Sequence, residues 1–244
     1  MAKGTMALYG KNSIYERLRA NPKSIKNVFM TDHFSHEQIE SLIHKYHIPA
    51  KRLSAKEHAK LRPAKDLQGI VAEVDKFQYY DFQNILDSQH ARMPIFLDRI
   101  NDPQNLGVMV RIAACFGSFA IVIPEHESCE VNETVLHVAC GGENFVKICM
   151  VTNLSKAIIE AKKSGFWIVG ADVNEDAQDI QEVSLNFPLG LVMGSEGEGI
   201  RPGIQKHLDF RVRIPMQGAS LSFNVSMACA IFCYEISRQK GKAL

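Results

Sequence analysis

Polar residues interrupt apolar stretches at three places in the second half of the chain, each where a strand gives way to a loop and a helix. In α/β sheets ligands bind beyond the carboxyl ends of the strands, so side chains at such junctions are candidates for binding and catalysis. A guanidinium there can hold phosphate, and amides, hydroxyls and carboxylates can hydrogen-bond a sugar. The candidate residues are Asn105, Arg111, Glu196, Ser222 and Asn224.

The first place begins where Asp102 and Pro103 turn the chain and Asn105 can cap a helix. Arg111 follows six positions later in a run that is otherwise apolar, and six helical residues span about 600°, so the two need not share a face. Such an arginine is usually a snorkelling side chain or half of an ion pair. The functional alternative is a positive charge offered to phosphate, and this stretch alone favours the structural interpretation.

The second place, residues 189–200, is an apolar strand followed by a loop with three glycines. Glycines let the backbone approach a ligand closely. The loop lacks the Lys-Ser/Thr ending of a phosphate-cradling loop, and Glu196 and Glu198 would repel phosphate. We therefore expect a neutral or cationic ligand, or a ribose hydroxyl. A plain glycine turn with solvated carboxylates is the alternative.

The third place, residues 211–226, ends a strand at Ile214 and Pro215 and begins an apolar helix at Ser222 or Asn224. Both residue types are good helix caps. Capping alone would explain their presence.

The elements that position these residues alternate along the chain. Short apolar runs at 95–97, 120–123, 167–171 and 189–193 predict strands buried on both faces of a parallel sheet. Helical spacing at 106–116, 130–139 and 154–163 predicts helices between them, and Gly117 and Gly165 stand where a helix would end. This alternation predicts an α/β sheet domain. A last helix at 224–238 is apolar nearly all round, which favours packing on its own sheet and on a second subunit.

The front of the chain, residues 1–76, is predicted to be a separate small α/β domain, with helices near 14–20, 36–44 and 54–61 and strands at 27–31 and 69–74. Residues 77–93 are polar and are the expected linker to a domain at 94–244. The front carries 14 Lys and Arg against 8 Asp and Glu, whereas the rest carries 14 against 19. A basic domain on an acidic body indicates a polyanionic partner, although a solvated surface is the alternative.

Composition narrows the class of protein. With 46% apolar and 23% charged residues the chain is neither disordered nor fibrous. No run of about 18 apolar residues and no signal-peptide core are present, so we expect a cytoplasmic protein without a membrane segment. The six cysteines form no C-x-x-C pair. Cys229 and Cys233 are spaced for a metal on a helix, but without a nearby His they are interpreted as core thiols, and no metal is expected.

In order and spacing the three places resemble the motifs of the SpoU family of RNA 2′-O-ribose methyltransferases, part of the SPOUT superfamily. The first motif corresponds to Asn105, Gly107 and Arg111, and the second to Gly194, Glu196 and Gly199. The third corresponds to 214–216 and 222–226, with Phe223 where the family usually has Leu. The resemblance covers roughly 94–240. The front, with residues 9–11 and 68–72, is similar to the substrate-binding domain that precedes many members. The whole chain therefore resembles the members that methylate a guanosine of bacterial 23S ribosomal RNA.

The resemblance implies a parallel sheet with a C-terminal trefoil knot, a homodimer, and S-adenosylmethionine as methyl donor. It implies that Asn105, Arg111, Glu196, Ser222 and Asn224 serve the reaction. The implied donor-binding residues are Met193, Gly194, Gly199, Ile214, Met216 and Phe223. Because a guanidinium stays protonated, we expect Arg111 to position and stabilise rather than to remove a proton. The front domain would hold RNA, and its candidate contacts are Lys11, Arg17, Arg19, Lys51 and Arg52.

Three other functions remain open from sequence. A transfer-RNA 2′-O-methyltransferase is nearest, although smaller members of that kind commonly lack such a front domain. A non-catalytic RNA-binding protein of the same fold is the second, and the intact motifs argue against it. A nicotinamide-dependent oxidoreductase ranks last, because no G-x-G-x-x-G follows an early strand.

Overall fold

The computed structural model describes residues 4–61, 67–86, 92–174, 176–218 and 221–241. By contacts the chain divides into two compact units. The front unit is Met1–Gln78 with Val131–Phe145, and the main unit is Tyr79–Glu130 with Val146–Leu244. This division differs from the expected domains in the segment 131–145, which groups with the front. Residues 87–91 of the expected linker lie outside the described residues.

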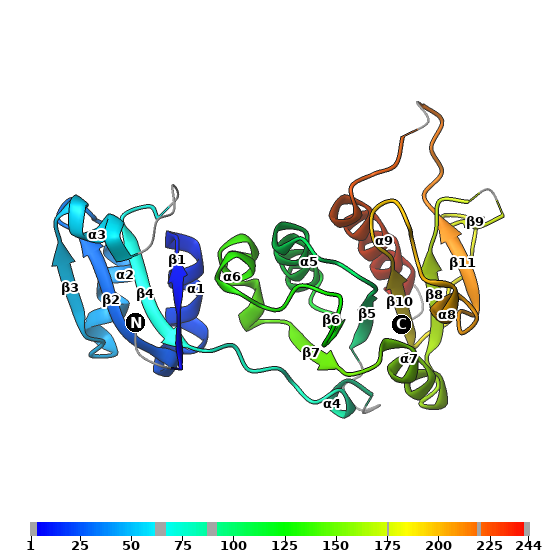
Figure 1. Cartoon of the computed structure of the whole chain (residues 1–244), viewed down its shortest axis with the longest axis horizontal. Coiled ribbons are helices and arrows are strands. Elements are labelled where there is room, and N and C mark those ends of the chain that lie inside the picture. The colour runs from blue at the N-terminus through cyan, green and yellow to red at the C-terminus, as the bar shows by residue number, and fades with distance from the viewer. Residues whose placement is uncertain (1–3, 62–66, 87–91, 175, 219–220, 242–244) are drawn as a thin grey trace. The chain divides into compact units, whose positions relative to one another are not determined.

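The main unit is built on a seven-stranded sheet whose neighbouring strands all pair in parallel, in the order β7-β6-β5-β10-β8-β11-β9 (Figure 1). The parallel α/β sheet predicted from sequence is confirmed. Two of its strands, β7 and β9, were not predicted. The strands are β5 (Met93–Leu97), β6 (Phe119–Pro124), β7 (Lys147–Val151), β8 (Trp167–Ala171), β9 (Gln178–Asp179), β10 (Leu189–Met193) and β11 (Phe210–Arg213).

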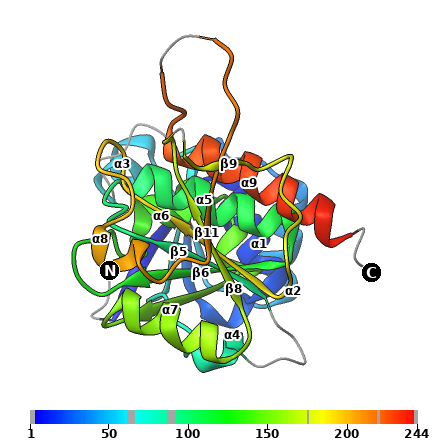
Figure 2. The same cartoon turned by 90° about the vertical axis from the view of Figure 1, so that its right-hand side faces the viewer.

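Helices cover both faces of this sheet, which is why β5, β6 and β10 are buried along their whole length. Helices α5 and α9 lie side by side on one face, and α4 and α7 lie on the other (Figure 2). The helices are α4 (Gln83–Leu86), α5 (Pro103–Phe116), α7 (Leu154–Lys163), α8 (Pro202–Gln205) and α9 (Val225–Lys240). Within the described part of the chain, no helix has the length and apolar character needed to span a membrane.

The order of the strands brings distant loops together. After β8 forms, the chain returns to insert β10 between β5 and β8, and then places β11 on the far side of β8. Met193 at the end of β10 pairs with Leu97 at the end of β5. The loops that follow these two strands therefore meet at the carboxyl edge of the sheet.

The front unit holds a mixed four-stranded sheet in the order β1-β4-β2-β3, which confirms a small α/β unit. Strand β4 pairs antiparallel with β1 and β2, and β3 pairs parallel with β2. Strands β1 and β3 were not predicted. The elements are β1 (Thr5–Tyr9), α1 (Lys11–Ala20), η1 (Pro22–Ser24), β2 (Ile25–Thr31), α2 (Glu37–Lys45), β3 (Ala50–Leu53), α3 (Ala55–Leu61), β4 (Ile70–Asp75), α6 (Glu133–Ala139) and η3 (Gly142–Asn144).

Segment 131–145 joins the front unit through buried polar contacts. The carboxylate of Glu133 accepts a hydrogen bond from Ala7 N of edge strand β1 at 2.8 Å. Arg17 Nη2 lies 2.9 Å from Glu143 Oε1, and both side chains are buried. Burial raises the pKa of Glu143 further than the Arg17 pair lowers it. The expectation that Arg17 contacts RNA is therefore wrong, because its side chain is buried in this ion pair.

Candidate active site

The candidate polar residues come from elements that the sheet brings together. The loop from β5 into α5 lies beside the glycine-rich loop after β10, because the two strands are parallel neighbours. Helix α9 packs against α5 and starts at the same edge. Asn105, Glu196 and Asn224 therefore meet, although they are far apart in the sequence.

Hydrogen bonds join these three side chains in a closed triangle. Asn224 Nδ2 donates to Glu196 Oε1 at 2.7 Å and to Asn105 Oδ1 at 3.0 Å. Asn105 Nδ2 donates to the same Glu196 oxygen at 3.3 Å. We call these residues the amide–carboxylate cluster.

Asn224 is also the N-cap of α9. Its Oδ1 accepts hydrogen bonds from Ser226 N at 2.9 Å and from Ser226 Oγ at 2.6 Å. Glu196 Oε1 accepts from Val225 N at 3.3 Å, and the N-terminus of a helix favours such a negative charge. The capping interpretation of Asn224 is confirmed, and the same side chain also belongs to the amide–carboxylate cluster.

The expectation that Asn105 caps α5 is wrong. Asp102 is the N-cap, and its Oδ1 accepts a hydrogen bond from Gln104 N at 2.8 Å. Pro103 takes the first helical position, which suits a residue without an N–H. Asn105 thus lies in the first turn of α5, and its side chain is directed to Glu196 instead.

The other two candidate residues are not members of this cluster. Arg111 is exposed on α5 and takes no part in the three hydrogen bonds of the triangle. Ser222 is exposed on the segment that leads into α9.

A cavity of about 220 Å³ adjoins the cluster. Glu196 and Ser222 belong to its wall, so the cluster and the cavity share a residue. Every residue expected to bind the methyl donor also lines it: Met193, Gly194, Gly199, Ile214, Met216 and Phe223.

The walls of the cavity are largely apolar. Met216 and Phe223 both belong to the segment between β11 and α9. Each is 44% exposed, and exposed large apolar side chains around a cavity mark a surface that a ligand covers. The exchange of Leu for Phe at 223 keeps this apolar character.

Gly194 allows the glycine-rich loop to fold tightly on itself. A Cβ atom built at Gly194 would lie 2.1 Å from the carbonyl carbon of Gly199, so no side chain fits there. Gly199 N donates to Ser195 O at 3.0 Å, which closes the loop on itself. The glycines of this loop therefore allow two backbone segments to pass in contact.

Asp172 lines the same cavity and was not found from the sequence. Its Oδ1 accepts hydrogen bonds from Val173 N at 2.7 Å and from Asn174 Nδ2 at 2.8 Å, and its Oδ2 accepts from Arg211 at 3.1 Å. Burial raises the pKa of Asp172, but the hydrogen bonds from Asn174, Val173 and Arg211 outweigh it and leave the pKa below its usual value. The available signal was an acidic residue directly after an apolar strand.

A second missed contact links β5 to the segment after the glycine loop. Asp98 is fully buried, and its carboxylate accepts from Arg201 N at 2.9 Å and from Arg201 Nε at 2.8 Å. The same guanidinium donates to Glu127 at 2.6 Å. These hydrogen bonds hold the loop after β5 and the glycine-rich loop after β10 together at the carboxyl edge of the sheet.

No group of three or more His, Cys, Asp and Glu side chains that could hold a metal is found among the residues with described positions. The thiols of Cys229 and Cys233 are both buried, with their sulfur atoms 3.9 Å apart.

Comparison with known proteins places this geometry in a family. The family model described as the SpoU rRNA Methylase family matches residues 92–234, and a model described as RNA 2′-O ribose methyltransferase substrate binding matches residues 7–80. The chain is 34% identical over 241 residues to a protein of Coxiella burnetii named 23S rRNA (guanosine-2′-O-)-methyltransferase RlmB, and 96% of each chain is covered.

Two further comparisons agree. A Synechocystis protein named uncharacterized tRNA/rRNA methyltransferase slr0955 is 38% identical over 178 residues, which are 71% of this chain and about half, 46%, of that protein. The solved structure of the SpoU methyltransferase AviRb from Streptomyces viridochromogenes, in complex with AdoMet, matches with a TM-score of 0.81 at 20% identity, over 98% of this chain and 92% of that one. At this identity the likeness shows the fold alone. With the family model covering more than half of its length, the chain belongs to the SpoU rRNA methylase family.

Proposed function

We propose that this chain transfers a methyl group from S-adenosylmethionine to a ribose 2′-hydroxyl of RNA, and that its target is a guanosine of 23S ribosomal RNA. The observation that carries the proposal is the position of Glu196. Its side chain lines the donor cavity and also accepts hydrogen bonds from Asn105 and Asn224. The name of the Coxiella relative supports the choice of substrate.

The residues of the cavity fit S-adenosylmethionine. Met216 and Phe223 would cover the adenine ring, and Gly194 and Gly199, which line the cavity, would contact the donor through their backbone. Asp172, which carries a negative charge at neutral pH, would favour the cationic parts of the donor. The donor supplies a methyl group on a sulfonium, so the leaving group is neutral and no metal is required.

The cluster residues would orient the ribose. Within the described structure only Oε1 of Glu196 accepts hydrogen bonds, which leaves Oε2 to accept the 2′-hydroxyl. Arg111, exposed on α5, would hold the adjoining phosphate and stabilise the developing negative charge on the ribose oxygen. Ser222 would contact the target nucleotide. Fixing the hydroxyl in line with the methyl group supplies much of the rate enhancement.

The front unit is proposed to hold structured RNA through its basic surface. The guanidinium of Arg52 donates hydrogen bonds to Glu40 and to the carbonyl oxygens of Thr31, Asp32 and Phe34. Lys51 is exposed on edge strand β3 and makes no such hydrogen bonds within the described structure. It is therefore the better candidate for an RNA contact. The domain boundaries at 76 and 94 remain part of this proposal.

A homodimer is proposed from α9. Met227 and Tyr234 on this helix are 62% and 60% exposed, which is unusual for large side chains on a helix otherwise packed in the core. A trefoil knot is proposed from the strand order, in which β10 enters between β5 and β8. Work on ribosomal RNA would place the protein in the cytoplasm.

The test is methyl transfer from labelled S-adenosylmethionine to unmodified 23S ribosomal RNA and, in parallel, to unmodified transfer RNA. Label on the ribosomal RNA alone is the expected result. Label on transfer RNA alone would support the proposed methyl transfer but contradict the proposed ribosomal RNA substrate. Absence of donor binding would favour a non-catalytic RNA-binding protein.

A further inference from the structure

Arg99 has a backbone conformation that a non-glycine residue rarely adopts. It lies two residues after the end of β5, and its φ is 60°. Positive φ in a residue with a long side chain costs energy, and such positions concentrate at sites where the side chain must be aimed. Arg99 lies at the carboxyl edge of the sheet, where the loop after β5 meets the glycine-rich loop.

The neighbours of Arg99 fix this conformation. Asp98 is fully buried, donates its N–H to Met193 O at 2.8 Å, and accepts hydrogen bonds from Arg201. Ile100 is buried, and its carbonyl oxygen accepts from Cys129 N at 2.8 Å. The residue between them is thus held on both sides, and its side chain extends toward the glycine-rich loop.

The guanidinium of Arg99 is only partly used. Its Nη1 pairs with Glu198 of the glycine-rich loop, and its Nε is buried without a hydrogen-bond partner among the described residues. The Arg99 side chain is 21% exposed, whereas that of Glu198 is 73% exposed. An ion pair with so exposed a partner adds little stability and is readily exchanged. A guanidinium can offer two parallel N–H groups to one acceptor, and Glu198 takes one nitrogen.

We propose that Arg99 is a substrate-binding residue that holds a phosphate of the RNA strand next to the target ribose, and that Glu198 occupies its guanidinium when RNA is absent. The inference rests on RNA being the substrate of this site. Phosphate matches the fork of an arginine and would replace the single contact to Glu198 by two.

The charges around the site explain why such a residue is needed. The exposed carboxylates of Asp102, Glu127, Glu196 and Glu198 lie on the loops at this edge of the sheet. RNA approaching this edge meets several negative charges, and Arg201 is already engaged by Glu127 and by the buried Asp98. Arg99 can change partner from Glu198 to RNA because that partner is exposed.

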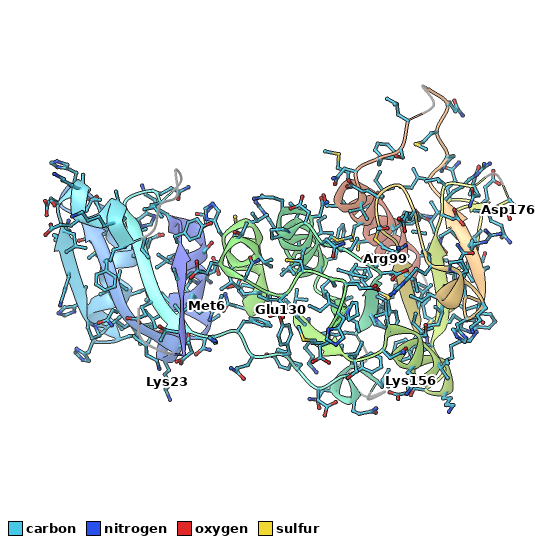
Figure 3. All side chains as sticks on the ribbon, in the orientation of Figure 1. Met6, Lys23, Arg99, Glu130, Lys156 and Asp176 are labelled. Atoms are coloured by element: carbon cyan, nitrogen blue, oxygen red, sulfur yellow. The ribbon has the colours of Figure 1, made fainter. Side chains whose placement is uncertain are left out.

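The experiment measures the affinity of unmodified 23S ribosomal RNA at several salt concentrations for the wild type, Arg99→Ala, Arg99→Gly and Glu198→Gln. The control is Lys156→Ala, which removes one positive charge from an exposed position of α7 in the same unit (Figure 3). Donor affinity is measured for each variant. Alanine keeps the backbone cost that arginine already bears at the positive φ of position 99, whereas glycine relieves it. A loss of RNA binding that both variants share therefore belongs to the guanidinium and not to the backbone.

Both Arg99 variants are expected to weaken RNA binding about tenfold, and to reduce the steepness of log K against log salt by about 0.7 to 0.9, as loss of one phosphate contact does. Donor affinity should stay unchanged in them, and RNA affinity should stay unchanged in Lys156→Ala. Glu198→Gln should bind RNA at least as tightly as the wild type.

Two results would overturn the proposal. The first is an unchanged salt dependence in Arg99→Gly. The second is equal weakening of RNA binding by Arg99→Gly and Glu198→Gln, because then the ion pair serves the loop and not the substrate. A wild type that binds no RNA would instead contradict the proposed function, before any variant is compared.

Discussion

Asn224 Nδ2 lies 2.7 Å from Glu196 Oε1, so the residue that caps α9 also holds the carboxylate of the glycine-rich loop. The same amide nitrogen reaches Asn105 on α5 at 3.0 Å. One side chain therefore ties three segments of the site, and its two roles can be separated by mutation.

Asn224→Ser is expected to keep the stability of α9, because serine caps a helix nearly as well as asparagine. It should nevertheless lower methyl transfer, because serine lacks the amide group that joins Glu196 and Asn105. Asn224→Ala should lose both the cap, worth about 1 kcal/mol, and the activity. Thermal unfolding and initial rates measure the two effects. Equal rates in the wild type and Asn224→Ser would contradict the assigned role.

Gly194→Ala is expected to destabilise the loop and abolish donor binding, because the new Cβ would lie 2.1 Å from the carbonyl carbon of Gly199. Backbone cannot yield as a side chain can, so the cost should reach about 1–3 kcal/mol or more. Gly203→Ala is the matched control, since nothing lies within 4 Å of its Cβ position. Calorimetric titration with S-adenosylmethionine checks the prediction, and wild-type affinity in Gly194→Ala would refute it.

Arg111→Ala is expected to reduce the rate of methyl transfer about 100-fold or more, as loss of one charge-stabilising group does. Donor affinity should change little, because Arg111 is not among the residues that line the cavity. Arg111→Lys should recover part of the rate, because it keeps the charge but not the planar fork. If Arg111→Ala turned over at the wild-type rate, its proposed role would be wrong.

The charge of Asp172 makes the stability of the folded chain depend on pH. Its pKa is lowered in the folded chain, so its contribution to stability is fully present above its unfolded pKa of 3.8 and is lost as pH falls through the lower folded value. Asp172→Asn should therefore melt below the wild type at neutral pH, and the gap in Tm should narrow as pH falls below 3.8. A gap that stays constant over this range would mean that the charge of Asp172 does not hold Arg211 and the loop.

Features that depend on a local pattern of residues could be predicted from the sequence. The apolar run at 189–193 and the glycines after it predicted β10 and the loop that forms the cavity, and α7 was found with its observed ends. Asn105 was misjudged as a cap because Asp102 and Pro103 together form a better helix start, and spacing alone did not rank them.

Long-range pairing accounts for most of what the sequence did not predict. Arg17 looked like a surface charge, yet Glu143 neutralises it from 126 residues away. Asp98 and Arg201 are 103 residues apart and became partners only because β10 inserts beside β5. β7 was missed although residues 148–151 form a short apolar run like those that predicted β6 and β10.

The most direct test of the account is to digest the methylated RNA to nucleosides and identify the labelled product by mass spectrometry. The account predicts a guanosine that carries the methyl group on its ribose and makes the adjoining phosphodiester resistant to alkali. A nucleoside methylated on its base would contradict it, because Glu196, Asn105 and Asn224 would then be orienting something other than a ribose hydroxyl.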